Sequence, residues 1–255
     1  MTDEAAFAPV TTGFCSSGRN ACHGGFARYD MMEGMDTTRV KRPVRALGVL
    51  MGAVMALLMC APSGVAQAAP AETARDVISI GDPGAPGQIE LFVDPLCPFS
   101  GKMIQQQGAE IGRRIENGSL HVNLRFVNFL ERLSASGTYD SRAIYAAFAV
   151  AGYSRDSGVT WRFIEQIFSA EQQPKEQGNT DLSNDQLAGL ADRAGAPRLA
   201  QDLIRLGLFV GYDPVAIANS NQAALRQFAE PGVPTVLIDG RPYDGNSDWM
   251  SRLPR

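Results

Sequence analysis

The sequence predicts an α/β domain that carries an inserted layer of helices. Three patterns support this fold class: a strand, a helix and a second strand between residues 88 and 126, a long stretch without strand character, and a short hairpin near the end. A chain of 255 residues with 45% hydrophobic composition can bury one sizeable core. The formal net charge of -4 and the absence of a basic cluster beyond residue 45 make nucleic acid an unexpected partner.

The first 68 residues are expected to lie outside the folded domain. Residues 1–34 lack periodicity and are interpreted as a non-native or disordered extension. Residues 35–68 contain the three parts of a secretory signal peptide: a basic segment, an apolar run over 46–59 and an Ala-Gln-Ala cleavage site at 66–68. The apolar run is shorter than the roughly 20 residues of a membrane-spanning helix. We therefore expect a mature domain over 69–255, secreted or placed in the periplasm or cell envelope; an uncleaved membrane anchor is the alternative.

Cysteine positions limit the chemistry of the mature domain. Cys15, Cys22 and Cys60 fall in the leader, so Cys97 is the only cysteine after residue 68. An internal disulfide and a multi-cysteine metal site are thereby excluded from the mature domain, and no metal is expected. A single thiol is compatible with a disulfide-linked dimer through Cys97.

The strand-helix-strand opening follows from local patterns. A turn cluster at 81–87 precedes an apolar run over 88–93, which is typical of a buried strand. A helix is expected from Cys97 to Asn117-Gly118, with isoleucines at helical spacing. Apolar and polar residues then alternate over 120–126, which predicts a second strand.

A helical insertion is expected over about 135–229, because no strand pattern occurs there. Ser183 and Gln186 form a capping-box pattern, and Asp213 followed by Pro214 indicates an N-cap with proline at the first helical position. The expected helices cover 139–153, 161–170, a segment after residue 183, 197–209 and 214–228.

The chain is expected to end with a hairpin. Strand formers at 235–238 are followed by Asp239-Gly240 and a partner strand at 241–244. The tail after residue 247 allows about one helical turn. No repeat or low-complexity linker interrupts residues 69–255, so one domain with an insertion is predicted.

Cys97 is the leading candidate for chemistry. It follows a strand and a short turn, and Pro98 suits the first position of the helix behind it. Free N–H groups at a helix start favour a thiolate, so we expect a lowered pKa for Cys97, with Ser100 able to donate a hydrogen bond to the sulfur. The alternative is a buried structural cysteine, which is common.

A second candidate feature is the segment Gly232-Val233-Pro234-Thr235. A proline directly before a strand is either an ordinary start of an edge strand or a cis proline that serves a tight local geometry. Neither interpretation can be chosen from this segment alone.

Together, Asp94-Pro95-Leu96-Cys97-Pro98-Phe99-Ser100, the helical insertion and the Val-Pro-Thr segment before the hairpin resemble the DsbA-like branch of the thioredoxin superfamily from about residue 80 to the end. The resemblance implies a thioredoxin-like fold with an inserted helical subdomain. It implies a nucleophilic cysteine at the helix start, beside a cis-proline loop that binds extended polypeptide. The site residues expected on this basis are Cys97, Ser100 and Pro234 for catalysis, and Pro98, Phe99, Val233 and Thr235 for substrate binding.

The sequence departs from the family pattern at two positions. Ser100 stands where the family has its resolving cysteine, and a hydroxyl cannot release a mixed disulfide by internal attack at neutral pH. Leu91 occupies the position six residues before the nucleophile where many relatives keep a buried acid, and Glu90 lies on the other face of that strand. Asp94 is expected to have a turn role, and His121 is expected to be solvated.

These features predict an exported monothiol protein for thiol–disulfide exchange, in which Cys97 attacks a disulfide and an external low-molecular-weight thiol releases it. Its partners would be polypeptides or small thiols, and no resident cofactor is expected. One alternative is a redox-inactive module that binds polypeptide in the cis-proline groove. Another is a thiol-cofactor-dependent transferase or isomerase of the kappa type, in which Ser100 has the leading role.

Overall fold

The computed structural model describes residues 76–254. The predicted extension at 1–34, the predicted signal peptide at 35–68 and the three leader cysteines lie outside the described residues. Within residues 76–254, no helix has both the length and the apolar character needed to cross a membrane.

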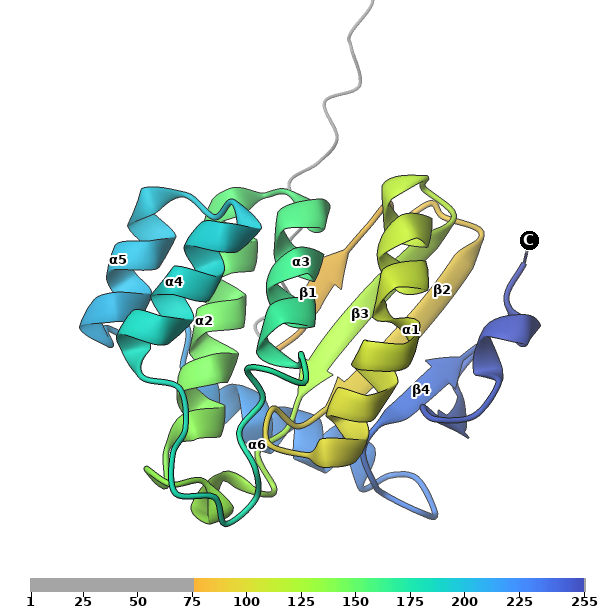
Figure 1. Ribbon diagram of the computed structural model, residues 1–255. Coiled ribbons are helices and arrows are strands. Elements are labelled where there is room, and N and C mark those ends of the chain that lie inside the picture. Colours follow the sequence, from red (N-terminus) through yellow and green to blue (C-terminus); the bar gives the residue numbers. More distant parts are fainter. Residues whose placement is uncertain (1–75, 255) are drawn as a thin grey trace, which may run out of the picture. The chain divides into compact units, whose positions relative to one another are not determined.

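A sheet of five strands forms the centre of the described region (Figure 1). The strands are β1 (Ile78–Ile80), β2 (Gly87–Val93), β3 (Leu120–Phe126), β4 (Thr235–Ile238) and β5 (Arg241–Asp244). Their order is β1-β3-β2-β4-β5. β2 is parallel to β3 and antiparallel to β4, and the two edge strands pair antiparallel with their neighbours. The predicted strand-helix-strand opening and terminal hairpin are confirmed.

The two faces of β2 bury different sets of side chains. Leu91 and its neighbours two positions away pack in the main core together with α1 (Pro98–Glu116). Phe92 points to the opposite face, where it packs with Leu237 and with Leu225 of α6 (Pro214–Leu225). This alternation buries both sides of the central strand. The carboxyl end of β2 lies beside the start of α1 (Figure 1).

The helical insertion packs around one buried helix. α2 (Tyr139–Ser154) is buried on nearly all sides from Tyr139 to Val150, as expected for a helix without a polar face. The short turn η1 (Glu131–Leu133) precedes the insertion, whose other helices are α3 (Ser157–Ile167), α4 (Asn184–Ala194), α5 (Arg198–Leu206) and α6. The predicted capping box of Ser183 and Gln186 is confirmed, and so is the Asp213 cap before α6. The tail forms one short turn, η2 (Trp249–Arg252).

The sequence prediction missed β1, and this changes the surroundings of His121. β1 pairs with β3, so Ser79 lies beside the His121 ring, with 2.7 Å between Ser79 Oγ and Nε2. Gln88 Oε1 lies 2.8 Å from Nδ1. His121 is therefore buried and hydrogen-bonded, and the expectation that it is solvated is wrong. Burial lowers the pKa of this histidine.

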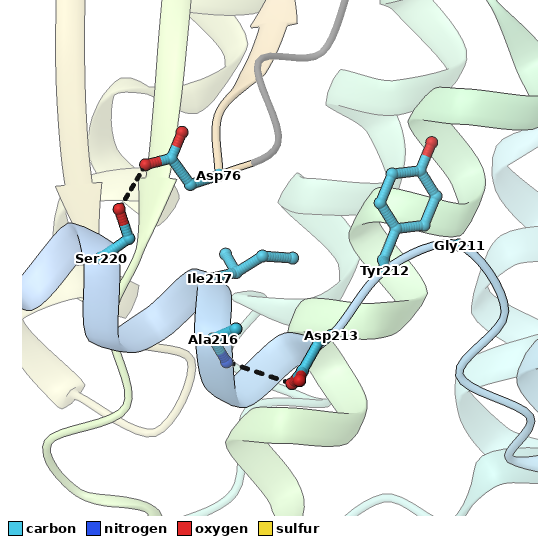
Figure 2. A pocket seen from close by; sticks show the side chains of 7 residues that line it. All are labelled: Asp76, Gly211, Tyr212, Asp213, Ala216, Ile217 and Ser220. Atoms are coloured by element: carbon cyan, nitrogen blue, oxygen red, sulfur yellow. Dashed lines mark hydrogen bonds between the residues drawn. The ribbon is translucent and has the colours of Figure 1, made fainter.

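A surface pocket of about 690 Å³ lies where the described chain begins (Figure 2). Asp76 lines it and accepts a hydrogen bond of 2.5 Å from the Ser220 hydroxyl of α6. Asp213, the other acid in the lining, accepts hydrogen bonds from the N–H groups of Val215 and Ala216. The Asp76 carboxylate thus joins α6 to the first described residues, and the Asp213 carboxylate stabilises the start of α6. None of the lining residues belongs to the Cys97 site.

Candidate active site

Cys97 is the N-cap residue of α1. Its backbone is extended, with φ of -68° and ψ of 119°, and Pro98 follows at the first helical position. The Cys97 carbonyl accepts the first intrahelical hydrogen bond from the Gly101 N–H at 3.0 Å. Its own N–H donates to the Asp94 carbonyl oxygen at 3.1 Å. The tight turn after β2 therefore fixes the position of the thiol relative to the helix start.

The Cys97 thiol faces the loop before β4. Its Sγ atom lies 3.8 Å from the carbonyl oxygen of Val233, 136 residues away in the sequence. The Val233–Pro234 peptide bond is cis. The Thr235 hydroxyl donates a hydrogen bond of 2.7 Å to the Gly232 carbonyl oxygen, which braces this loop. The fold thus brings together the two features that the sequence analysis singled out.

An open groove of about 430 Å³ runs along the same loop. Val233, Pro234 and Thr235 line it, together with aromatic side chains that include Tyr243 and Phe228. Such a concave surface with aromatic side chains in its walls suits an extended peptide.

Pro98 and Phe99 lie outside the lining of this groove, at the exposed start of α1. The Phe99 residue is 62% exposed. Asn246, just after β5, donates a hydrogen bond of 3.3 Å to the Phe99 carbonyl oxygen. This contact ties the segment after the hairpin to the helix start.

Burial raises the pKa of the Cys97 thiol, and this is the largest influence on it. The N–H groups of Ser100 and Phe99 lower the pKa, the charge of Asp94 raises it, and the Ser100 hydroxyl lowers it. The prediction that the helix start would lower the pKa is therefore wrong in its net direction. The helix N–H groups act as expected, but the loss of solvent around a residue that is only 5% exposed outweighs them.

Ser100 lies in the interior on the first turn of α1, with 0% exposure. The Asp94 N–H donates to its Oγ atom at 3.3 Å. The hydroxyl is thus held at the turn between β2 and α1. It is not presented to solvent or to the groove.

Asp94 is more than the turn residue that the sequence analysis expected. Its carboxylate accepts hydrogen bonds from the N–H groups of Leu96 at 2.9 Å and Leu130 at 3.1 Å. These bonds fix the turn before Cys97 and join it to the loop after β3. Asp94 has 0% exposure, and burial raises its pKa to about 6. The available signal was an acid placed directly after an apolar strand pattern, three residues before the cysteine.

Gln173 is a site residue that the sequence analysis missed. It lies in the loop after α3, where no periodic pattern marks it. Its side-chain amide donates to the carbonyl oxygens of Pro95 at 3.1 Å and Cys97 at 2.9 Å. The loop of the helical insertion therefore holds the turn that carries the thiol.

We expect Gln173→Leu to destabilise the fold by about 1–3 kcal/mol, because two hydrogen bonds are lost. The Pro95 carbonyl loses its partner, whereas the Cys97 carbonyl keeps the Gly101 N–H. Urea unfolding followed by circular dichroism measures this change. Gln172→Leu is the matched control, since the Gln172 side chain makes no hydrogen bond to the described residues, and its effect should stay within about 0.5 kcal/mol. Equal effects of the two substitutions would contradict the role given to Gln173.

The remaining candidates have structural positions. Leu91 has 0% exposure in the main core, so no acid lies at this family position. Glu90 lies on the opposite face, where its Oε2 is 2.7 Å from Nε of Arg125. Among residues 76–254, no group of three or more His, Cys, Asp or Glu side chains is placed to hold a metal ion.

Residues 73–252 match the model of the family described as thioredoxin. The chain belongs to this family. Solved structures of DsbA-like proteins have a similar fold: MdbA, a thiol-disulfide oxidoreductase from Corynebacterium matruchotii, has a TM-score of 0.58 at 24% identity, covering 71% of this chain and 88% of that one. The reduced form of DsbG from Mycobacterium tuberculosis has a TM-score of 0.56 at 25% identity, covering 69% and 82% of the two chains. Reduced DsbA from the same organism has a TM-score of 0.55 at 25% identity, covering 66% and 85%.

Curated relatives place a similar segment inside a larger protein. The serine/threonine-protein kinase PknE of Mycobacterium tuberculosis (strain H37Rv) is 30% identical over 181 residues, and the same values hold for PknE of Mycobacterium bovis. The match covers 70% of this chain but only 31% of those kinases. This DsbA-like protein thus spans less than a third of the relatives it matches.

Proposed function

We propose that this DsbA-like protein is an exported monothiol protein for thiol–disulfide exchange, with Cys97 as its nucleophile. The observation that carries the proposal is the contact of 3.8 Å between the Cys97 Sγ and the Val233 carbonyl oxygen, beside a groove that suits polypeptide. Among the described residues Cys97 is the only free cysteine, so no second thiol completes a pair there.

The exchange proceeds in two steps that balance. The Cys97 thiol first loses its proton, and the thiolate attacks one sulfur of a substrate disulfide. A new bond joins Cys97 to that sulfur, and the other sulfur leaves as a thiolate that takes up a proton. An external low-molecular-weight thiol then attacks the mixed disulfide, because the Ser100 hydroxyl cannot act as a resolving thiol. The attack falls on the substrate sulfur, so a new disulfide joins that sulfur to the external thiol while its bond to Cys97 breaks. Cys97 leaves as a thiolate and takes up the proton that the attacking thiol lost. No resident cofactor is required.

The substrate contacts in this proposal come from two sides of the thiol. The Val233-Pro234-Thr235 loop, which lines the groove, would bind an extended polypeptide there, while the exposed Pro98 and Phe99 would contact it at the start of α1. Export would depend on residues 35–68, whether cleaved as a signal peptide or retained as an anchor. A dimer linked through Cys97 stays a prediction.

The raised pKa of the resting thiol has a kinetic consequence. Since only the thiolate attacks, exchange at neutral pH uses a small ionised fraction, and the rate should rise with pH. The same burial favours the second candidate function, a redox-inactive module that binds polypeptide in the groove and keeps Cys97 as a buried residue. The exchange function predicts catalytic turnover of a disulfide substrate, whereas the binding module predicts none.

We expect Cys97→Ala to lower the glutathione-dependent reduction of a peptide disulfide by the full chain at least about 100-fold, to the uncatalysed rate. The variant keeps Cys15, Cys22 and Cys60, so any activity of the leader thiols contributes equally to the rates of both proteins. An unchanged rate would overturn the proposal. If the unaltered chain shows no turnover, and both proteins bind the reduced peptide with the same Kd, the binding module replaces it.

A further inference from the structure

Two aspartates close to the thiol are buried together and have no part in the exchange steps. Asp94 follows β2, and Asp140 stands in the first turn of α2. Both have 0% exposure. The loop after β3 joins them: the Leu130 N–H donates to Asp94 Oδ2 at 3.1 Å. Glu131, the next residue, accepts a hydrogen bond of 2.9 Å from the N–H of Ser141, which follows Asp140. Each carboxyl group also affects the pKa of the other. These two residues are called the aspartate pair below.

The two members of the pair differ in their partners. The Asp94 carboxylate accepts hydrogen bonds from the N–H groups of Leu96 and Leu130. Neither oxygen of Asp140 has a hydrogen-bond partner among the described residues. Hydrogen bonds to a carboxylate favour its ionised form, whereas a buried charge without partners is costly. Asp94 is therefore the member that ionises first, and Asp140 is the member that keeps its proton.

The electrostatic surroundings agree with this assignment. Burial raises the pKa of Asp94 to about 6. Burial, followed by the charge of Asp94, raises the pKa of Asp140 to about 9. Between these values the aspartate pair holds one proton and one negative charge, as two close carboxyl groups do when they titrate together.

Among the described residues, the charged and titratable groups around the aspartate pair do not neutralise its negative charge. Glu131 of η1 adds a negative charge that raises the pKa of Asp140 further. On α2, Arg142 is paired with Asp181 at 2.8 Å, and Tyr139 is buried and uncharged. The remaining group is Cys97 at the start of α1. The charge of Asp94 raises the pKa of its thiol.

We propose that the aspartate pair holds a single proton at neutral pH and that the charge left on Asp94 opposes ionisation of Cys97. The pair thereby keeps the resting thiol protonated and sets the pH range in which it becomes a nucleophile. Asp94 and Asp140 are positioning residues in this arrangement, because they act through the sulfur and not on a substrate. The consequence for catalysis rests on the proposed exchange function, whereas the titration of Cys97 does not.

The test is the alkylation rate of Cys97 in the full chain, followed from about pH 5 to about pH 11 by mass spectrometry of the peptide that contains it. Asp94→Asn should shift the midpoint down and speed alkylation at neutral pH by about tenfold, which corresponds to about one pKa unit. Asp140→Asn should match the unaltered chain at neutral pH and alkylate faster only at alkaline pH, where Asp140 gains its charge. Asp202→Asn, on exposed α5, is the control and should change nothing.

An unchanged profile for a folded Asp94→Asn variant would overturn the proposal. If that variant does not fold, the infrared spectrum of the unaltered chain decides: a carbonyl band of a protonated carboxylic acid should be present at about pH 8 and absent in Asp140→Asn. Lack of that band in the unaltered chain would overturn the proposal as well. Both measurements read ionisation and not exchange, so failed turnover leaves this inference intact, and an unchanged alkylation profile leaves the proposed function intact.

Discussion

Replacing Ser100 with cysteine is expected to shorten the lifetime of the mixed disulfide on Cys97 at least about 100-fold when no external thiol is present. Ser100 stands three residues after Cys97 on the first turn of α1, where side chains point back toward the helix start. A thiol at this position attacks the mixed disulfide from within the same turn. A step that requires a second molecule thus becomes intramolecular.

The surroundings of Ser100 favour this outcome. Its hydroxyl is buried at the turn, where it accepts a long hydrogen bond from the Asp94 N–H at 3.3 Å. A sulfur atom is a small apolar replacement there and loses little hydrogen bonding. The new pair would close as a disulfide between residues 97 and 100 after each release, so a reductant is still consumed.

The measurement is the decay of a purified adduct between Cys97 and a peptide, followed by non-reducing mass spectrometry. Ser100→Ala is the matched control, since it removes the hydroxyl without adding a thiol, and its adduct should persist. A Ser100→Cys adduct that persists equally long would show that the thiol at position 100 cannot reach the Cys97 sulfur.

Local patterns were enough to predict most of the fold. The alternation over 120–126, the helical isoleucines before Asn117 and the capping residues Ser183 and Asp213 act within a few residues of one another. β1 escaped prediction because Ile78-Ser79-Ile80 is too short to show a period. Because β1 was not predicted, the environment of His121 was predicted wrongly as well, since its burial depends on Ser79 of β1.

The chemistry of the site was less predictable because it depends on contacts between distant segments. The helix start beside Cys97 is visible in the sequence, but the burial that raises its pKa comes in part from the Val233 loop. Gln173 reaches the turn from a loop without any sequence pattern. Asp140 sits among buried alanines and aromatics of α2, and no local rule distinguishes it from an exposed acid in the first turn of a helix.

Asp140→Asn is expected to stabilise the folded protein at neutral and alkaline pH by about 2–4 kcal/mol. The pKa of Asp140 is raised from 3.8 to about 9 on folding, first by burial and then by the charge of Asp94. Folding therefore takes up a proton between these two pH values. The stability that the protonated acid allows is fully present at low pH and is lost as pH rises toward the folded pKa.

The asparagine variant removes this proton uptake, since an amide does not titrate. The gain in stability should thus be small near pH 4 and should grow steadily toward about pH 8, as urea unfolding at each pH would measure. A gain in stability of the same size near pH 4 and near pH 8 would indicate a packing effect of the amide instead of titration. A loss at every pH would mean that Asp140 is ionised in the folded protein and stabilised there. The pH dependence, more than the size of the change, therefore reports where the proton of the aspartate pair resides.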